Sequence, residues 1–417
     1  MGLENEIFRQ NPQWRGQELA EDTLRRDLEA DIRDEIDEDI VTAVTGIRRV
    51  GKTTLLQRLI DDLEEDEIRT FYYSFDVEKA EVKELLNTFF DEVLNQDPEA
   101  LEEKVYIFLD EVQKIESWSD HVKAYHDSYE NLKFFVTGSS SANIKAGSGE
   151  SLVGRISLHH LTPLKFSEYL RARNIEVPEK DLENLPTPEN PNKIRPKLEE
   201  YLETGGFPGL IDLKQNTRRE RLKDILDLTL YRDVVEMFDL GRPELLEAIF
   251  RSVTEQTGQS ANYNKMAKNL DAQYKTVRKY IDSLEQSFLI EKSRRFQNNT
   301  LQEYKKRPKL YTGEHSFCQL ESTEKGLIAE TAAYNHLKTR GKTGHWKKNG
   351  EVDIILKQKE DLKAFEIKYR RETSRDDLEN LEKFKKEHPE AETYLITKNE
   401  LDRDKNKIPL WLLLTHL

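Results

Sequence analysis

The sequence predicts an α/β protein: a parallel sheet of the P-loop NTPase class, then a helical region with a winged-helix module, then a small α/β domain. Three observations support this: a phosphate-loop motif, strands alternating with helices over residues 40–165, and mixed strands and helices again over residues 310–417. The chain has 417 residues, enough for two to four domains at roughly 150 residues each.

A complete G-x-x-x-x-G-K-[ST] motif lies between an apolar run at 40–44 and a helix-like run at 53–63. In this setting the N–H groups of the turn and the helix dipole favour bound phosphate. We expect Lys52 to reach the β- and γ-phosphates of ATP and the Thr53 hydroxyl to contact Mg²⁺. Sequence does not decide whether Arg48 and Arg49 contact phosphate or an adjoining domain. The residues expected to bind ATP are Gly46, Arg48, Arg49, Val50, Gly51, Lys52, Thr53 and Thr54.

An apolar run at 105–109 ends in two acids, as a strand entering a nucleotide site does. We expect Asp110 to hold Mg²⁺ and Glu111 to act as general base. A strand at 70–75 falls between the loop strand and this acid strand, and together with the glutamate it favours the additional-strand, AAA-like class. The predicted strands are Ile40–Thr45, Thr70–Phe75, Val105–Leu109, Leu132–Thr137 and Ile156–His160.

Two further polar residues are catalytic candidates. Ser139 follows the strand at 132–137, where it either senses the γ-phosphate or caps a helix. Arg155 either stabilises transition-state charge, in its own chain or in a neighbouring one, or is a surface arginine. Gln113 and Trp118 are expected to pack or cap rather than to catalyse.

The segments GIRRVGKTT, FLDEVQKIESW, VTGSSS, LVGR, LTPLKFSEYL and ETGGFPG occur in this order along the chain. In combination they resemble the prokaryotic AAA-type ATPases that end in a restriction-nuclease-like domain. The resemblance covers nearly the whole chain from about residue 40. It implies ATP binding and hydrolysis at Lys52, Thr53, Asp110 and Glu111.

The charge is distributed unevenly. The net charge is −15, with 13 acidic and 5 basic side chains in residues 1–40 but 13 Lys/Arg and 6 Asp/Glu in residues 251–310. A single cysteine, no signal segment and no run of 18 apolar residues predict a cytoplasmic protein without a membrane span. The expected parts are an N-terminal helical segment (1–39), the ATPase domain (40–175), a linker and helical lid (176–245), a winged-helix-like domain (246–305) and a nuclease-like domain (306–417).

The basic region contains a helix, a short turn at 271–273 and a longer helix from Tyr274, which is the plan of a helix-turn-helix. Residues 288–290 and 294–295 are candidates for a wing. The module either contacts DNA or only packs between domains. The expected DNA contacts are Lys275, Thr276, Arg278 and Lys279.

Acidic residues follow strand spacing near the C-terminus. Glu351 and Asp353 share one face of a predicted strand, and Glu366 and Lys368 share one face of the next. Together with Glu330 on the preceding helix, the set resembles the PD-(D/E)XK fold in its E…ExD…ExK form, as in archaeal junction-resolving nucleases. The resemblance implies Mg²⁺ ligands at Glu330, Asp353 and Glu366, with Lys368 orienting water. Trp346 is followed by Lys347, where that ATPase family typically has arginine.

Two functions follow from these residues. One is an ATP-driven enzyme acting on DNA. The other is a nucleotide-dependent switch that recruits a protein partner, with an inactive nuclease fold as its docking surface. ATP and Mg²⁺ are the expected cofactors, DNA is the expected partner, and self-association is favoured if Arg155 acts on a neighbouring copy.

Overall fold

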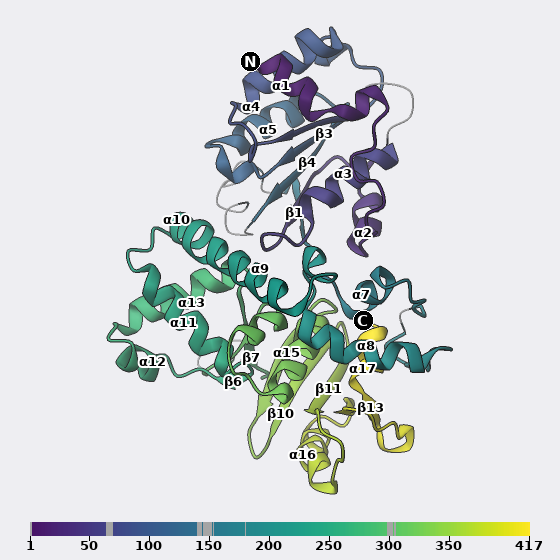
Figure 1. The fold of residues 1–417 in the computed structure, drawn as a ribbon, viewed down its shortest axis with the longest axis vertical. Helices are drawn as coiled ribbons and strands as arrows, with labels where there is room; N and C mark the ends of the chain where they lie inside the picture. The colour runs from purple at the N-terminus through teal and green to yellow at the C-terminus, as the bar shows by residue number, and fades with distance from the viewer. Residues whose placement is uncertain are drawn as a thin grey trace. The chain divides into compact units, whose positions relative to one another are not determined.

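The computed structural model describes residues 2–63, 70–139, 144, 152, 154–179, 181–297, 303 and 306–417. They form two compact units, Met1–Thr162 and Pro163–Leu417, which are described separately below (Figure 1). This division is coarser than the five parts expected from the sequence.

The N-terminal unit is built on a five-stranded parallel sheet in the order β2-β3-β4-β1-β5. All five expected strands are present, with ends within one residue of those predicted. The strand that lies between the loop strand β1 and the acid strand β3 is β4, whereas β2 lies at the edge. The additional strand is therefore β4, not the strand at 70–75. The strands are β1 (Val41–Thr45), β2 (Thr70–Ser74), β3 (Val105–Asp110), β4 (Leu132–Gly138) and β5 (Ile156–His160).

Helices cover both faces of this sheet, with α4 and α5 on one side and α2 and α3 on the other (Figure 1). Strands β1, β2 and β4 are buried along their length because both faces are covered, whereas the edge strand β5 is half-buried. The core includes Phe71, Phe89, Phe134 and Trp118, so Trp118 packs as expected. The helices are α1 (Leu3–Gln10), α2 (Leu28–Asp34), α3 (Lys52–Leu63), α4 (Val82–Thr88) and α5 (Trp118–Ser128), with short turns at Pro12–Arg15, Phe89–Leu94, Pro98–Ala100 and Val112–Lys114.

The C-terminal unit begins with helices. Within the linker and helical lid expected over residues 176–245, α8 already starts at Pro191, where a proline fits the first helical position. Pro196 lies inside that helix. The helices of this first part are α7 (Phe166–Ala172), α8 (Pro191–Thr204), α9 (Gln215–Leu228), α10 (Val235–Phe238), α11 (Pro243–Glu255), α12 (Tyr263–Asn269) and α13 (Tyr274–Gln286), with turns at Pro208–Leu210 and Thr229–Val234.

One eight-stranded sheet, in the order β13-β12-β11-β10-β9-β7-β8-β6, runs through the rest of this unit. Of the residues expected to form a wing, Ile290, Arg294 and Arg295 lie in β7, which pairs with β8 and also with β9, and the wing itself stays a prediction. The strands are β6 (Gln259–Ser260), β7 (Ile290–Arg295), β8 (Lys309–Thr312), β9 (Lys342–Lys347), β10 (Glu351–Gln358), β11 (Asp361–Lys368), β12 (Glu392–Thr397) and β13 (Lys407–Pro409). The helices are α15 (Lys325–Leu337), α16 (Glu379–Glu387) and α17 (Leu410–Thr415), with turns at His315–Leu320, Arg375–Leu378 and Arg403–Lys405.

Helices α15 and α16 pack against the sheet near the acidic residues of the C-terminal unit. An apolar cluster that includes Trp346, Val352, Leu381 and Phe384 joins α16 to the sheet. Strand alternation places Asp353, the neighbour of Val352, on the opposite face, where it shares a lysine partner with Glu330 of α15. Within the described residues, no helix has the length and apolar character needed to cross a membrane.

Candidate functional site

The phosphate loop connects β1 to α3, and its conformation depends on two glycines. Gly51 has a φ of 102°, which side-chain-bearing residues rarely adopt. A Cβ at Gly46 would lie 2.4 Å from the carbonyl oxygen of Leu161, so only glycine fits there. The Lys52 ammonium donates to the Gly46 carbonyl oxygen over 3.0 Å and is buried beneath the loop. Val50 is buried, Arg48 and Thr54 are half-buried, and Arg49 is exposed.

Asp110 ends β3 with its carboxylate among hydroxyl donors. Thr53 Oγ1 donates to Oδ2 over 2.8 Å and Thr137 Oγ1 donates to Oδ1 over 2.5 Å. Tyr72 and Ser74 on β2 also donate to Oδ2. Burial and the neighbouring Glu111 charge raise the pKa of Asp110. A hydroxyl and one buried carboxylate suit Mg²⁺, which usually completes its shell with water and substrate phosphates.

Glu111 lies beside both the phosphate loop and Ser139. Its Oε1 is 3.5 Å from Lys52 Nζ, and Gln113 Nε2 donates to its Oε2 over 2.5 Å and to Ser139 Oγ over 3.3 Å. Burial opposes ionisation, but Lys52, Gln113 and Arg48 outweigh it and hold the pKa of Glu111 below its ordinary range. Glu111 is therefore an ionised carboxylate near the phosphate loop.

Gln113 is a functional candidate that sequence reasoning set aside. It bridges the expected base and the expected sensor, and its Oε1 is buried without a hydrogen-bond partner. A Cβ at Gly138 would lie 3.0 Å from that oxygen, so the glycine that ends β4 makes room for the amide. The D-E-x-Q spacing after a strand was the available signal.

Arg26 is a second residue the sequence did not single out. Its guanidinium is buried and donates to the carbonyl oxygens of Val50 (2.9 Å) and Thr162 (2.7 Å). The N-terminal segment thereby contacts the phosphate loop through the carbonyl oxygen of Val50.

Arg155 lies away from this site in its own chain. It precedes β5, and its carbonyl oxygen accepts from the N–H of Val41, at the start of β1. The phosphate loop leaves the other end of β1, about 13 Å further along at 3.3 Å per residue. The Arg155 side chain is 43% exposed and its Nε donates to Asp127 over 2.8 Å. The expectation that Arg155 acts on its own γ-phosphate is therefore wrong, while action on a neighbouring copy stays a prediction.

The predicted DNA-contact residues lie on α13. Lys275, Arg278 and Lys279 are exposed and Thr276 is half-buried. Arg278 Nε is 3.8 Å from Asp282, and Lys279 Nζ donates to the Asp239 carbonyl oxygen over 3.4 Å. The opposite face of α13 is buried through Val277, Ile281 and Leu284.

The acids of the C-terminal unit converge, but on a lysine. Lys309 Nζ, on β8, lies 3.7 Å from Glu330, 2.9 Å from Glu351 and 3.3 Å from Asp353. Its side chain is 3% exposed. Burial works against its charge, but Asp353, Glu330 and Glu351 prevail and raise the pKa of Lys309. Lys309 was not anticipated, because nothing in its local sequence distinguishes it.

The other polar groups of this cluster pair with one another. Glu366 accepts from Lys368 over 2.6 Å, while its other oxygen is buried without a hydrogen-bond partner. Burial and the Asp353 charge raise the pKa of both Glu330 and Glu366. Tyr311 donates to Glu330 over 2.7 Å.

As arranged, this cluster does not fit Mg²⁺. A buried ammonium already contacts the carboxylates that a divalent ion would need. Over the described part of the chain, no group of three or more His, Cys, Asp or Glu side chains is arranged to hold a metal ion. The metal role expected of Glu330, Asp353 and Glu366 stays a prediction, which this arrangement does not favour.

Family comparisons agree with this geometry. Residues 38–170 match a family described as an AAA domain. Residues 38–170, most of which belong to the N-terminal unit, are thus similar to AAA-type P-loop domains. Residues 195–320 and 325–413 match two domains of unknown function, DUF8612 and DUF4143.

The related proteins identified by sequence are uncharacterized. One from Haemophilus influenzae is 27% identical over 270 residues, 62% of this chain and 64% of its own length. Two from Methanocaldococcus jannaschii are 27% and 26% identical, covering 76% and 59% of this chain and 72% and 54% of their own lengths. This chain thus spans less than two thirds of the first relative.

Solved structures with detectable similarity include AMPPCP-bound DnaA from Aquifex aeolicus, at 16% identity and a TM-score of 0.32. That match covers 62% of this chain and 86% of DnaA. Domain III of Thermotoga maritima DnaA is 17% identical, with a TM-score of 0.27 over 47% of this chain and 89% of that domain. TM-scores this low do not establish a shared overall fold.

Proposed function

We propose that the protein binds ATP with Mg²⁺ at the N-terminal site and hydrolyses it. The observation that carries the proposal is the convergence of Lys52, Asp110 and Glu111 beside the phosphate loop. Mg²⁺ would be held by Thr53 and Asp110 and would neutralise charge on the phosphate oxygens.

The protein side chains divide the work. Besides its hydrogen bond to the Gly46 carbonyl oxygen, Lys52 makes a long ion pair with Glu111, at 3.5 Å, so an incoming phosphate competes for its ammonium at small cost. Gln113 and Arg48 still favour the ionised form of Glu111 when Lys52 turns to phosphate, so Glu111 acts as the base next to the γ-phosphate. Gln113 keeps Glu111 aligned and connects it to Ser139, which senses the γ-phosphate. Water oriented by Glu111 then attacks the γ-phosphorus of ATP.

The first experiment measures phosphate release by the wild type and by Lys52→Ala in Mg²⁺, with Lys83→Ala, an exposed lysine on α4, as a matched control. Hydrolysis that is lost in Lys52→Ala alone supports the proposal. Equal rates in all three proteins would place the activity elsewhere, or in a contaminant.

DNA association is the second part of the proposal. The element order α11-β6-α12-α13-β7-β8, with β6 and β7 both paired to β8, supports a winged-helix reading of this region. Lys275, Arg278 and Lys279 are exposed on α13 and Thr276 is half-buried, so phosphate contact from this helix is sterically open. DNA-stimulated ATP hydrolysis that falls with salt is the expected behaviour.

ATP hydrolysis could serve either of two functions of the C-terminal unit, DNA cleavage or binding of a protein partner. The order α15-β9-β10-β11-α16-β12 supports a PD-(D/E)XK-like reading, and a nuclease coupled to the ATPase follows if the site cuts DNA. Lys309, which neutralises the acids, favours the alternative: a nucleotide-dependent switch whose nuclease-like fold serves as a docking surface. DNA cleavage on a gel that disappears in Asp353→Asn, with ATP hydrolysis intact, supports the nuclease. No cleavage in either protein supports the switch.

A further inference from the structure

A groove in the C-terminal unit combines the two chemistries that a nucleic acid strand offers. It encloses about 510 Å³ beside α13, between the start of α12, strand β7 and residues 306–308. A space of this size is within the range of small-molecule sites. Tyr274, Arg278, Asp282 and Glu285 line it from one face of α13, because they recur at helical spacing.

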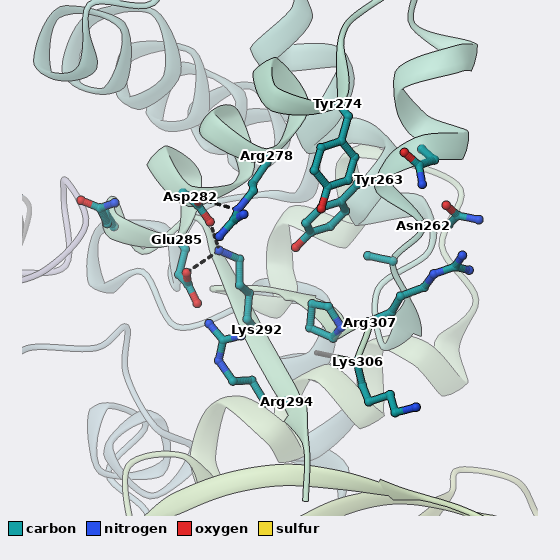
Figure 2. A pocket seen from close by; sticks show the side chains of 14 residues that line it. Asn262, Tyr263, Tyr274, Arg278, Asp282, Glu285, Lys292, Arg294, Lys306 and Arg307 are labelled. Carbon is teal, nitrogen blue, oxygen red and sulfur yellow. Dashed lines mark hydrogen bonds and ion pairs between the residues drawn. The ribbon is translucent and has the colours of Figure 1, made fainter. Parts of the chain in front are cut away.

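The charges around the groove are predominantly positive. Five Lys/Arg side chains and two acids line it. Lys292 on β7 is 5% exposed and pairs with both acids, Asp282 and Glu285, and Arg278 Nε also lies 3.8 Å from Asp282. Lys306 and Arg307 are exposed on a separate segment of the chain. Figure 2 shows Arg278, Asp282 and Lys292 close together on one side of the space, with Lys306 and Arg307 on another. Cationic groups on separate elements can meet successive phosphates along a strand.

Two aromatic rings adjoin these cations. Tyr274 is 44% exposed, and its ring lies 6.2 Å from that of Tyr263, centroid to centroid (Figure 2). An exposed ring at the edge of a basic groove is a platform on which an unpaired base can stack. A base pair inside a duplex presents only its edges and cannot use that face.

A second groove on the same unit provides a comparison. It encloses about 520 Å³ and shares Ala261 and Asn262 with the first, but it has no aromatic lining and only Lys265 and Glu255 as charged groups. These two adjoining grooves are similar in size, and the one beside α13 differs by its basic and aromatic lining.

We infer that the groove between α13 and β7 binds single-stranded DNA, with a base stacked on Tyr274 and phosphates at Arg278, Lys306 and Arg307. The inference rests on the DNA association proposed above and specifies its ligand. It also shifts the contact surface, since Arg278 lines the groove whereas Lys275 and Lys279 do not.

The test measures the affinity of the full chain for a fluorescein-labelled oligothymidylate and for a duplex of equal length, by anisotropy over a salt series in EDTA. Tyr274→Leu is expected to weaken oligothymidylate binding about 5- to 150-fold, as loss of one stacked base does, while Tyr274→Phe retains it. Lys306→Gln/Arg307→Gln is expected to reduce the steepness of the log–log salt dependence by about 1.4, at 0.7 per phosphate contact. Lys265→Gln/Lys268→Gln, the matched pair on α12 outside this groove, should leave that slope unchanged.

Duplex binding as tight as that of the single strand would overturn the inference. An equal reduction of the salt slope in the two double variants would overturn it as well. Unchanged binding in Tyr274→Leu would also overturn it. If the wild type binds neither DNA, the DNA association fails together with the groove, whereas the ATPase proposal stands or falls separately on Lys52→Ala. Arg307 and Lys306 are exposed, so their variants fold even if Tyr274→Leu does not.

Discussion

Each unit of the molecule places a buried lysine among acids, and the two lysines differ in how many carboxylates they meet. Lys52 is 5% exposed and approaches one carboxylate, Glu111, at 3.5 Å. Lys309 is 3% exposed and approaches three carboxylates between 2.9 and 3.7 Å. A lysine with one distant partner can exchange it for phosphate. A lysine that pairs with three acids in a largely buried cluster cannot leave without exposing uncompensated charge. The comparison suggests that the first site is built to bind a ligand and the second to remain closed.

The largest expected effect separates the chemistry of the first site from its binding. Glu111→Gln should lower the rate of ATP hydrolysis by about 10²- to 10⁴-fold, because it removes the base, while nucleotide affinity is retained. Phosphate release and binding of a fluorescent ATP analogue measure the two quantities. Glu116→Gln, exposed five residues further on, is the control. A variant that hydrolyses at the wild-type rate would remove Glu111 from the mechanism.

The second prediction concerns the closed site. Lys309→Met should lower the free energy of unfolding by about 3–5 kcal/mol, because three acids lose their buried counter-charge. Lys363→Met is the matched control, since Lys363 is also buried but pairs with one exposed carboxylate, Glu392, and should cost about 1 kcal/mol or less. Urea unfolding of both variants measures the difference. Similar losses would mean that Lys309 acts through packing alone.

A smaller effect is expected at the bridge between base and sensor. Gln113→Ala should slow ATP hydrolysis by about tenfold with little change in nucleotide affinity, because it removes one hydrogen bond to the charged Glu111. Steady-state phosphate release over a range of ATP concentrations separates the two. A change confined to the Michaelis constant would mark Gln113 as a binding residue instead.

The smallest effect is a pH dependence of stability at the second site. Burial opposes ionisation of Glu351, but Lys309 outweighs it and lowers its pKa from 4.5 to about 2. Because the folded pKa is below the unfolded one, the contribution is complete above about pH 4.5 and is lost as the pH falls towards 2. Glu351 is one-third exposed, so the contribution is about 1 kcal/mol or less. Unfolding curves of wild type and Glu351→Gln should converge in that window, and a constant offset would argue against ionisation as the cause.

The predictability of the two sites differed for a physical reason. The residues of the first site lie in two short segments, a loop between a strand and a helix and the end of a strand. The sequence of each segment predicts its local geometry. These residues are Lys52, Thr53, Asp110 and Glu111. Lys309 belongs to a strand that reaches Glu330, Glu351 and Asp353 only through sheet pairing and helix packing, so no local pattern indicates it. The location of Arg155 could not be predicted for the same reason. The residue precedes β5, and only the parallel pairing of β5 with β1 places it at the end of β1 away from the phosphate loop.

The sequence by itself determined the strands of the N-terminal sheet, the phosphate loop and the acid pair, because local apolar runs, glycines and polar strand ends specify them. It also indicated several elements of the C-terminal unit, although it missed β6, β8, β9, β13, α16 and α17. Only the tertiary structure decided that β4 lies beside β1, that Gln113 joins Glu111 to Ser139, and that Lys309 neutralises the C-terminal acids. These features depend on strand order, register and burial, which arise from contacts between residues far apart in the chain.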